Sequence, residues 1–387
     1  MRFLVISGAP LFVKDDVKAA YPPYVREMDI WFSQVQNIKI VSPGTYPFSF
    51  PTKEFKRQDV GFTSLSFLQF KGVRKSIISL LSLPGILLKL KEEMRETDHI
   101  HLRCPGNISL LGCMIQIFFP SKSKTVKYAG NWDPQSHQPF SYKLQKAIIR
   151  NSFLSKNMKV LVYGDWPEQS KNIVPFFTAS FRESEKETIV KDFREPLKMI
   201  FAGALVKGKR PMLAIKLVEK LRSSGVDMEL DLFGEGELKK TLENYIQKNQ
   251  LCGFIRLNGS VPLEELKQEY KKAHFLILAS KSEGWPKAMA EAMFFGCIPV
   301  STSVSCVPWM LDYGKRGVLL GSGSDSENED DRESILIKRG FDQIRSLMGK
   351  LEVLKEMSTE AMRWSQQYTL EKFEAEIEKL LISEEQL

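Results

Sequence analysis

Two glutamates, Glu283 and Glu291, are the strongest candidates for chemistry in this sequence. They lie eight residues apart in the stretch SEGWPKAMAEAMFFGCIPVSTS, and Glu291 falls inside the apolar run Ala288 to Phe295. Burying an unpaired carboxylate costs roughly several kcal/mol, so such a residue is paired, faces solvent or is kept to bind a ligand. We interpret Glu291 as a hydroxyl acceptor for a ligand. The alternative is that it caps a helix or pairs with a lysine.

An anion site is predicted beside these glutamates. Pro286 suits the first turn of a helix. The backbone amides of Lys287, Ala288 and Met289 would then be free donors at the helix N-terminus. Both carboxylates would border this phosphate-sized site, one from the preceding loop and one from the second turn.

Two glycine-containing loops could also bind a phosphate or a base. The first, GALVKGKRP, contains three cations: Lys207, Lys209 and Arg210. The second, FGEGEL, contains Gly234, Glu235 and Gly236. Glycine lets the backbone approach a ligand, and a lysine supplies countercharge. Each loop alone is a weak signal, because tight turns and solvated lysines have the same composition.

Short apolar runs alternate with helical patterns along the chain, which predicts parallel sheets with crossover helices. The expected strands of the first half are 4–6, 38–41, 100–102, 126–129 and 160–163. Those of the second half are 199–203, 229–233, 254–258, 275–278, 298–301 and 318–320. The carboxyl ends of such strands meet at one edge, where nucleotides bind. We therefore predict an α/β fold of two doubly wound domains, 1–190 and 191–387, with the seam in the polar run 180–196.

Composition places the chain among globular proteins of the cytoplasm. It is 43% hydrophobic and 26% charged, and its five cysteines contain no Cys-x-x-Cys pair, which argues against a disulfide framework or a zinc site. No apolar stretch reaches about 18 residues, so no membrane span is expected. The start, MRFLVISGAP, has too short an apolar run for a signal peptide and is interpreted as a buried strand.

Positive charge is concentrated in the first half. Residues 1–190 contain 26 Lys and Arg against 16 Asp and Glu, a net +10, whereas the remainder is −2. This asymmetry favours an anionic partner such as a lipid phosphate or the inner face of the cell membrane, and a solvated basic surface explains it equally well. The apolar and lysine-containing segment 71–91 could lie in a membrane interface, but a domain helix packed on the sheet is the favoured interpretation.

The stretch EGWPKAMAEAMFFGCIPV resembles the signature of the retaining glycosyltransferases of family 4, the group 1 glycosyl transferases. The resemblance continues through FAGALVKGKRP, LDLFGEGEL, IRLNGSVPLEEL and RWSQQYTLEKFEAEIEKLL. The first half resembles the family only in its alternating pattern and in Gly8 of the first loop. The resemblance implies the GT-B fold, with a donor cleft between two Rossmann-like domains and a last helix, about 370–387, that crosses back onto the first domain.

The resemblance also implies roles for the second-half candidates. Glu291 would accept hydrogen bonds from the nucleotide ribose, Glu283 would contact the transferred sugar, and Lys209 would neutralise the diphosphate. Ala204 stands where the family has an arginine, so Lys207 or Arg210 would substitute for it. The segments 234–236 and 260–262, the latter containing Val261, would frame the base.

The family's first-half histidine has no obvious match. Asn131 in KYAGNWDP stands near its place and is the catalytic candidate, with Trp132 and Asp133 beside it on the acceptor side. His101 and Arg103, at the end of an earlier strand, are alternative acceptor-side candidates.

The implied function is sugar transfer, with retention of configuration, from a nucleotide diphosphate sugar to a hydroxyl acceptor. The acceptor would be a saccharide or a lipid-linked saccharide in the synthesis of a cell-surface polysaccharide or glycolipid. No metal, cofactor or nucleic acid is implied. Alternatives are a GT-B sugar-nucleotide epimerase or phosphorylase, and an inactive nucleotide-sugar-binding protein, which the Ala204 departure keeps open.

Overall fold

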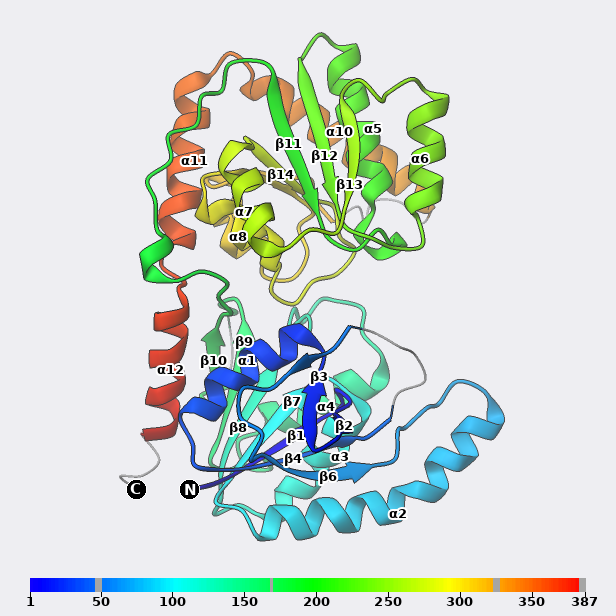
Figure 1. Ribbon diagram of the computed structural model, residues 1–387, viewed down its shortest axis with the longest axis vertical. Helices are drawn as coiled ribbons and strands as arrows, with labels where there is room; N and C mark the ends of the chain where they lie inside the picture. Colours follow the sequence, from blue (N-terminus) through cyan, green and yellow to red (C-terminus); the bar gives the residue numbers. More distant parts are fainter. Residues whose placement is uncertain (46–50, 168–169, 323–327, 383–387) are drawn as a thin grey trace. The chain divides into compact units, whose positions relative to one another are not determined.

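The chain folds into two compact units (Figure 1). The computed structural model describes residues 1–45, 51–167, 170–322 and 328–382. The N-terminal unit contains residues 1–177 and the end of the chain from Phe373, and the C-terminal unit contains residues 178–372. The last helix, α12 (Leu370–Ile382), therefore begins in the C-terminal unit and continues in the N-terminal unit.

The N-terminal unit is built on a parallel sheet of seven strands in the order β10-β9-β8-β7-β1-β4-β6. Its strands are β1 (Arg2–Ser7), β4 (Asn37–Pro43), β6 (Gly61–Leu65), β7 (His99–Cys104), β8 (Ser123–Tyr128), β9 (Met158–Tyr163) and β10 (Ile173–Phe176). Its helices are α1 (Pro22–Ser33), α2 (Val73–Arg95), α3 (Asn107–Ile115) and α4 (Phe140–Arg150). A small antiparallel sheet joins β2 (Phe12–Lys14), β3 (Val17–Ala20) and β5 (Lys53–Glu54).

The C-terminal unit is built on a parallel sheet of six strands in the order β13-β12-β11-β14-β15-β16. Its strands are β11 (Leu197–Ala202), β12 (Met228–Phe233), β13 (Ile255–Gly259), β14 (Phe275–Leu278), β15 (Ile298–Ser301) and β16 (Val318–Leu319). Its helices are α5 (Pro211–Ser223), α6 (Lys239–Lys248), α7 (Leu263–Lys272), α8 (Lys287–Phe294), α9 (Val307–Met310), α10 (Glu329–Leu347) and α11 (Leu351–Ser365). Every strand predicted from the apolar runs is present, and the predicted doubly wound α/β architecture is confirmed.

The edge strands β6 and β10 of the first sheet were not predicted. The β6 sequence GFTSL begins with glycine and is largely accessible to solvent, and β10 consists of IVPF, whose proline cannot donate to a ladder. An edge strand is buried on fewer sides than a central one, so its sequence needs fewer apolar residues. These two edge strands therefore have a weak apolar signal, and the short strands β2, β3 and β5 of the small antiparallel sheet were not predicted either.

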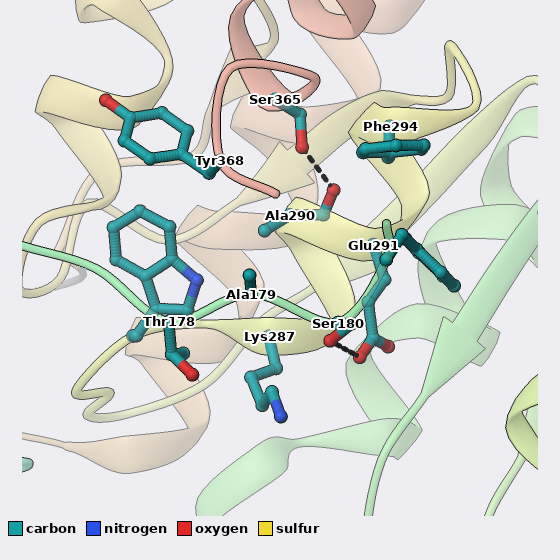
Figure 2. A pocket seen from close by; sticks show the side chains of 11 residues that line it. Thr178, Ala179, Ser180, Lys287, Ala290, Glu291, Phe294, Ser365 and Tyr368 are labelled. Carbon is teal, nitrogen blue, oxygen red and sulfur yellow. Dashed lines mark hydrogen bonds between the residues drawn. The ribbon is translucent and has the colours of Figure 1, made fainter. Parts of the chain in front are cut away.

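The C-terminal unit begins with a segment that packs on α8 (Figure 2). The Phe181 ring centroid lies 5.0 Å from those of both Phe294 and Phe295. On the other side of the boundary, Phe176 packs on Phe373 of α12 at 5.5 Å. The boundary between the two units therefore lies between residues 177 and 178, whereas the sequence analysis predicts it after residue 190.

None of the helices in the described part of the chain combines the length and apolar composition needed to cross a lipid bilayer.

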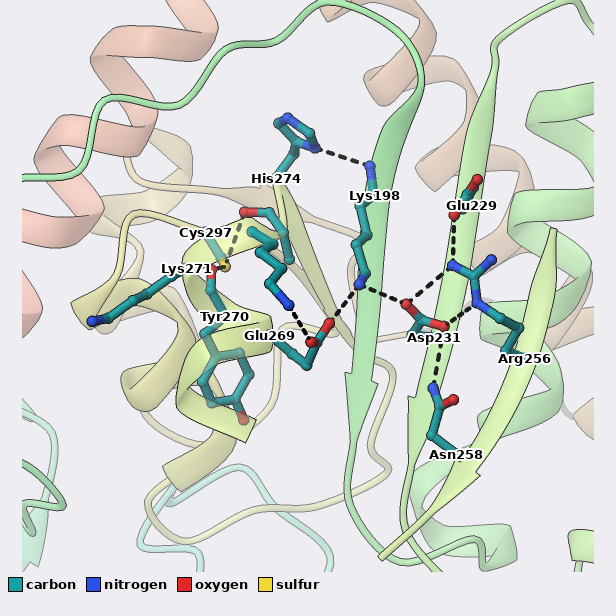
Figure 3. Close-up of polar contacts among 12 residues, drawn as sticks. Lys198, Glu229, Asp231, Arg256, Asn258, Glu269, Tyr270, Lys271, His274 and Cys297 are labelled. Carbon is teal, nitrogen blue, oxygen red and sulfur yellow. Dashed lines mark hydrogen bonds and ion pairs between the residues drawn. The ribbon is translucent and has the colours of Figure 1, made fainter. Parts of the chain in front are cut away.

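A buried carboxylate holds the first strands of the C-terminal sheet together (Figure 3). Asp231 on β12 has a side chain that is 4% exposed, and it accepts hydrogen bonds from Arg256 Nε at 2.7 Å and Asn258 Nδ2 at 3.1 Å. Lys198 Nζ lies 2.8 Å from the same carboxylate and 2.6 Å from Glu269 of α7. Burial alone would raise the pKa of Asp231, but the hydrogen bonds from Arg256, Lys198 and Asn258 hold it below its usual value.

We predict that Asp231→Asn lowers the free energy of unfolding near neutral pH by about 2–3 kcal/mol, because two cations lose a shared countercharge. For a domain of this size the melting temperature falls by about 5–10 °C. The folded pKa is depressed, so the stabilisation is present above the unfolded pKa of about 4 and is lost as pH falls through the folded pKa. The difference between wild type and variant should therefore shrink in acid.

Melting temperatures recorded by circular dichroism across this pH range test the prediction. Glu229→Gln is the matched control, because Glu229 contacts the same Arg256 at 2.5 Å but its side chain is 33% exposed. An equal loss of stability in both variants, or a difference that does not change with pH, would contradict the assignment.

Candidate functional site

Glu291 lies in the second turn of α8 and its carboxylate faces away from the core. Its neighbours Ala292, Met293 and Phe294 are buried, whereas Glu291 is half-buried. The Ser180 hydroxyl donates a hydrogen bond of 2.6 Å to Glu291 Oε1 (Figure 2). Glu291 is therefore a hydroxyl acceptor in this structure.

The first turn of α8 differs from the expectation in one respect. The amides of Met289 and Ala290 both donate to the Pro286 carbonyl, at 3.0 and 3.1 Å. The prediction of a free Met289 amide is therefore wrong, because Pro286 occupies the N-cap position and its carbonyl already begins the helical hydrogen bonding. Lys287 and Ala288 lie at the first two positions of the helix.

Glu283 is the ion-pair partner of Lys209. The two residues belong to loops that follow different strands, β14 and β11, and Lys209 Nζ donates to Glu283 Oε1. The Glu283 side chain is only 9% exposed, whereas that of Lys209 is 31% exposed. The sequence placed both residues in one site without predicting this contact. Because the Glu283 carboxylate is less exposed than the Lys209 ammonium group, the cation lies on the solvent side of the pair.

The other two cations of the β11 loop have different environments. Arg210 is buried, adopts a left-handed backbone conformation with φ 50° and ψ 53°, and donates to Glu329 of α10 at 3.0 Å. Lys281 contacts the same Glu329 carboxylate at 2.8 Å. Arg210 therefore anchors the start of α10, which argues against the predicted role in donor binding. Lys207 is exposed.

Glycines bring the loops after β11 and β12 into direct contact. A Cβ atom on Gly234 would lie 1.9 Å from the Gly203 carbonyl oxygen, and one on Gly236 would lie 2.5 Å from the Leu205 carbonyl oxygen. The Leu205 amide donates to the Glu235 carbonyl at 2.9 Å, and the Gly234 amide donates to the Gly259 carbonyl at 2.7 Å. The carboxyl ends of β11, β12 and β13 are thus joined by backbone hydrogen bonds. At Gly234 and Gly236 there is no room for a side chain.

The remaining candidates of these loops lie at the edge of that layer. The Glu235 carboxylate forms an exposed ion pair of 2.8 Å with Lys239. Val261 follows β13 and is half-buried. The Lys281 amide donates to the Gly208 carbonyl at 2.9 Å, so the loop that contains Lys209 is tied to the loop that contains Glu283.

A small open recess, about 260 Å³ when the open solvent above it is included, lies beside Glu291 (Figure 2). Its lining combines the segment 178–181 with Trp285, Lys287 and residues of α8, and Ser365 and Tyr368 complete it. The Ser365 hydroxyl donates to the Ala290 carbonyl at 2.6 Å. The lining therefore has a polar side that contains a carboxylate and a lysine, and an aromatic side.

Sequence reasoning missed two parts of this pocket. Ser180 lies 111 residues before Glu291, in a polar run that was assigned to the domain seam, and nothing in its neighbourhood marks it. The aromatic wall consists of Trp285, stacked on Trp364 with ring centroids 6.1 Å apart, and Tyr368 at 5.6 Å from Trp285. The position of Trp285, two residues after Glu283, was a signal that could have been used.

Two first-half candidates are core residues. His101 on β7 is fully buried, with Nδ1 2.8 Å from Thr125 Oγ1 and its ring 4.4 Å from Trp31 of α1. Burial, reinforced by the nearby charge of Arg103, lowers the pKa of His101 well below its usual value. Trp132 is 3% exposed and packs on Tyr128 at 4.9 Å. This burial argues against an acceptor-side contact of either side chain, because neighbouring residues enclose both.

The other first-half candidates remain accessible in part. Arg103 forms a bidentate ion pair with Glu27 of α1. Asn131 Oδ1 accepts a 2.9 Å hydrogen bond from the Asp133 amide, so the side chain fixes the turn that follows β8. Gly8 follows β1, and a Cβ atom there would meet no atom within 4 Å. All four residues belong to the N-terminal unit, whereas the pocket beside Glu291 is lined by residues of the C-terminal unit.

Comparisons with known proteins match part of the C-terminal unit to a family. Residues 183–344 match the family model described as glycosyl transferases group 1. The chain is 29% identical over 135 residues to the amylovoran biosynthesis glycosyltransferase AmsK of Erwinia amylovora, a match that covers 33% of this chain and 33% of AmsK. The chain thus spans about a third of the length of that relative.

Solved structures are similar over nearly the whole chain. HepE of Anabaena in complex with UDP aligns with a TM-score of 0.65 and 12% identity, covering 99% of this chain and 100% of HepE. Sucrose-phosphate synthase of Thermosynechococcus elongatus aligns with a TM-score of 0.63 and 13% identity, covering 99% and 98%. At these identities the likeness concerns the fold. The C-terminal unit therefore matches the glycosyl transferase group 1 family, glycosyltransferase family 4, through residues 183–344, and the chain as a whole has the GT-B fold.

Proposed function

We propose that this chain transfers a sugar from a nucleotide diphosphate sugar to a hydroxyl acceptor with retention of configuration. The observation that carries the proposal is the arrangement of Glu283 and Glu291 on either side of the α8 N-terminus, with Lys209 paired to Glu283. One cation and two carboxylates at a helix N-terminus can bind an anion and the hydroxyl groups next to it.

In this proposal Glu291 accepts hydrogen bonds from the ribose of the donor. The bond from Ser180 supports this role, because it shows that a hydroxyl reaches the carboxylate at 2.6 Å. Lys209 and the first amides of α8 bind the diphosphate and stabilise the charge that develops as it leaves. Lys207 is close in sequence and exposed, so it is the second cation of this group. The edge formed by Gly234, Gly236 and Val261 frames the base.

Glu283 contacts hydroxyl groups of the transferred sugar once Lys209 binds the diphosphate. The acceptor is a saccharide or a lipid-linked saccharide, in keeping with the polysaccharide pathway in the name of AmsK. We assign acceptor binding to the N-terminal unit, where Asn131 is the candidate for the position of the family histidine. The proposed place of the reaction is the cytoplasmic side of the cell membrane.

Melting-temperature shifts with UDP-, GDP- and ADP-sugars test donor binding, since a ligand that binds the native state raises its melting temperature. UDP-sugars come first, because HepE was solved with UDP. The bound donor is then incubated with saccharide acceptors, and the anomeric configuration of the product is determined by nuclear magnetic resonance. An inverted product, or no shift with any nucleotide sugar, would refute the proposal.

We predict that Glu291→Ala weakens binding of the free nucleoside diphosphate about tenfold to a hundredfold, because a charged hydrogen-bond acceptor is lost. Isothermal titration calorimetry measures the change. Ser180→Ala is the control. It removes the present hydroxyl partner and leaves the carboxylate, so affinity should stay the same or increase. Wild-type affinity in Glu291→Ala would contradict the ribose role.

A second pair of variants separates binding from turnover. Glu283→Gln should retain or strengthen nucleoside diphosphate binding, because Lys209 is released from its ion pair, while turnover falls about a hundredfold. Lys209→Met should weaken both binding and turnover. Glu264→Gln, at an exposed position of α7, is the control that should behave as wild type. Loss of nucleotide binding in Glu283→Gln would disprove the assignment.

We further predict that transfer continues in excess chelator, since lysine and helix amides meet the diphosphate charge in the proposed mechanism. Initial rates are compared with and without chelator after dialysis. A loss of activity that magnesium or manganese restores would show that a cation is required.

A further inference from the structure

Helix α2 (Val73–Arg95) has two apolar faces. Ile86, Leu90 and Met94 are buried and belong to the core of the N-terminal unit. A second set of large apolar side chains is exposed to solvent, and we call it the outward face of α2. It consists of Val73 (79% exposed), Ile77 (52%), Leu80 (56%), Leu81 (77%) and Leu88 (61%). Their spacing by three, four and seven residues places them on one side of the helix.

The outward face does not contribute to packing within the unit. The N-terminal half of α2 extends away from the sheet (Figure 1). It is attached through Ser79, whose hydroxyl accepts from the Gln69 amide and donates to the Gln69 carbonyl, both at 2.8 Å. Contiguous exposed apolar surface of this kind marks an interaction site in folded proteins.

The charges around the outward face are predominantly basic, and an exposed glutamate, Glu92, lies one turn beyond Leu88 at its C-terminal end. Residues 60–91 contain no aspartate or glutamate, and they contain five basic residues: Lys71, Arg74, Lys75, Lys89 and Lys91. Each of these five is exposed. Apolar side chains with basic residues beside them are complementary to a surface that is apolar inside and anionic at its rim.

We propose that the outward face of α2 docks on the surface of an anionic lipid bilayer. The leucine and isoleucine side chains enter the boundary between head groups and acyl chains, and the lysines and Arg74 contact lipid phosphates. A second copy of the chain is a poorer partner, because symmetric pairing of two α2 helices would bring Arg74 and Lys75 close to the same cations of the other copy. Docking requires neither donor nor acceptor, so this proposal can be tested independently of sugar transfer.

Vesicle sedimentation tests the proposal with the full chain and no nucleotide. Binding is compared on vesicles of phosphatidylcholine and on vesicles that also contain phosphatidylglycerol. The wild type should bind the anionic vesicles, and high salt should release it, because salt screens exposed charges. The triple variant Ile77→Gln, Leu80→Gln and Leu81→Gln should bind about tenfold more weakly. Arg74→Gln and Lys75→Gln should each lose about fivefold.

Matched controls distinguish docking through α2 from nonspecific adsorption of the protein to vesicles. The triple variant Val190→Gln, Leu263→Gln and Val353→Gln removes exposed apolar side chains of the C-terminal unit and should bind as wild type. All variants should keep the wild-type melting temperature, since the replaced side chains are exposed. Equal binding of wild type and α2 variants would overturn the proposal. Sedimentation velocity showing a wild-type dimer that the α2 variants abolish, without vesicle binding, would also overturn it and assign the face to a second copy.

Discussion

The C-terminal unit depends on a contact between two loop backbones that leaves no room for side chains. The loop after β12 lies against the loop after β11 so closely that a Cβ atom on Gly234 would overlap the Gly203 carbonyl. Backbone hydrogen bonds continue this contact to β13 and, through Gly208 and Lys281, to the loop after β14. Four strand ends are thereby fixed relative to one another, so the residues that follow them share one site. The glycines that looked like ligand contacts in the sequence therefore have a structural role as well.

The fixed positions of these loops also determine which charged side chains lie next to one another in the site. Lys209 and Glu283 come from different loops, and each lowers the cost of partly burying the other. In our proposal the donor diphosphate replaces Glu283 as the ion-pair partner of Lys209. Glu283 is then available to bind sugar hydroxyls. Glu291 differs because a serine hydroxyl is its partner, which a ribose hydroxyl can replace without leaving a buried cation. The two carboxylates of one helix N-terminus thus have different partners, which fits two different roles.

The sequence was sufficient for the central strands of the two parallel sheets and for α8, but not for the small antiparallel sheet or for the environment of single side chains. Central parallel strands are buried on both faces, so their apolar runs identify them, whereas the edge strands β6 and β10 have weaker signals. Glu283 and Glu291 became candidates because their local motif is unusual, and Lys209 became one through the resemblance to the family. The Ser180 contact, the anchoring of Arg210 on α10 and the burial of His101 depend on residues distant in the chain. No local pattern reports such contacts, because register and helix packing create them.

The two units differ in how their polar residues are used, and this difference bears on where chemistry and docking belong. Near the strand ends of the C-terminal unit, carboxylates and cations pair across loops at partial exposure, which keeps them accessible to a ligand. In the N-terminal unit His101 and Trp132 are packed inside, and Arg103 is held by Glu27. The unusual feature of that unit is instead on its surface, where α2 exposes apolar side chains among five cations. Because those side chains contribute nothing to the core, they can be changed without loss of stability, whereas Asp231 and the glycines cannot. In our two proposals the N-terminal unit therefore supplies membrane attachment, and the C-terminal unit supplies the donor site.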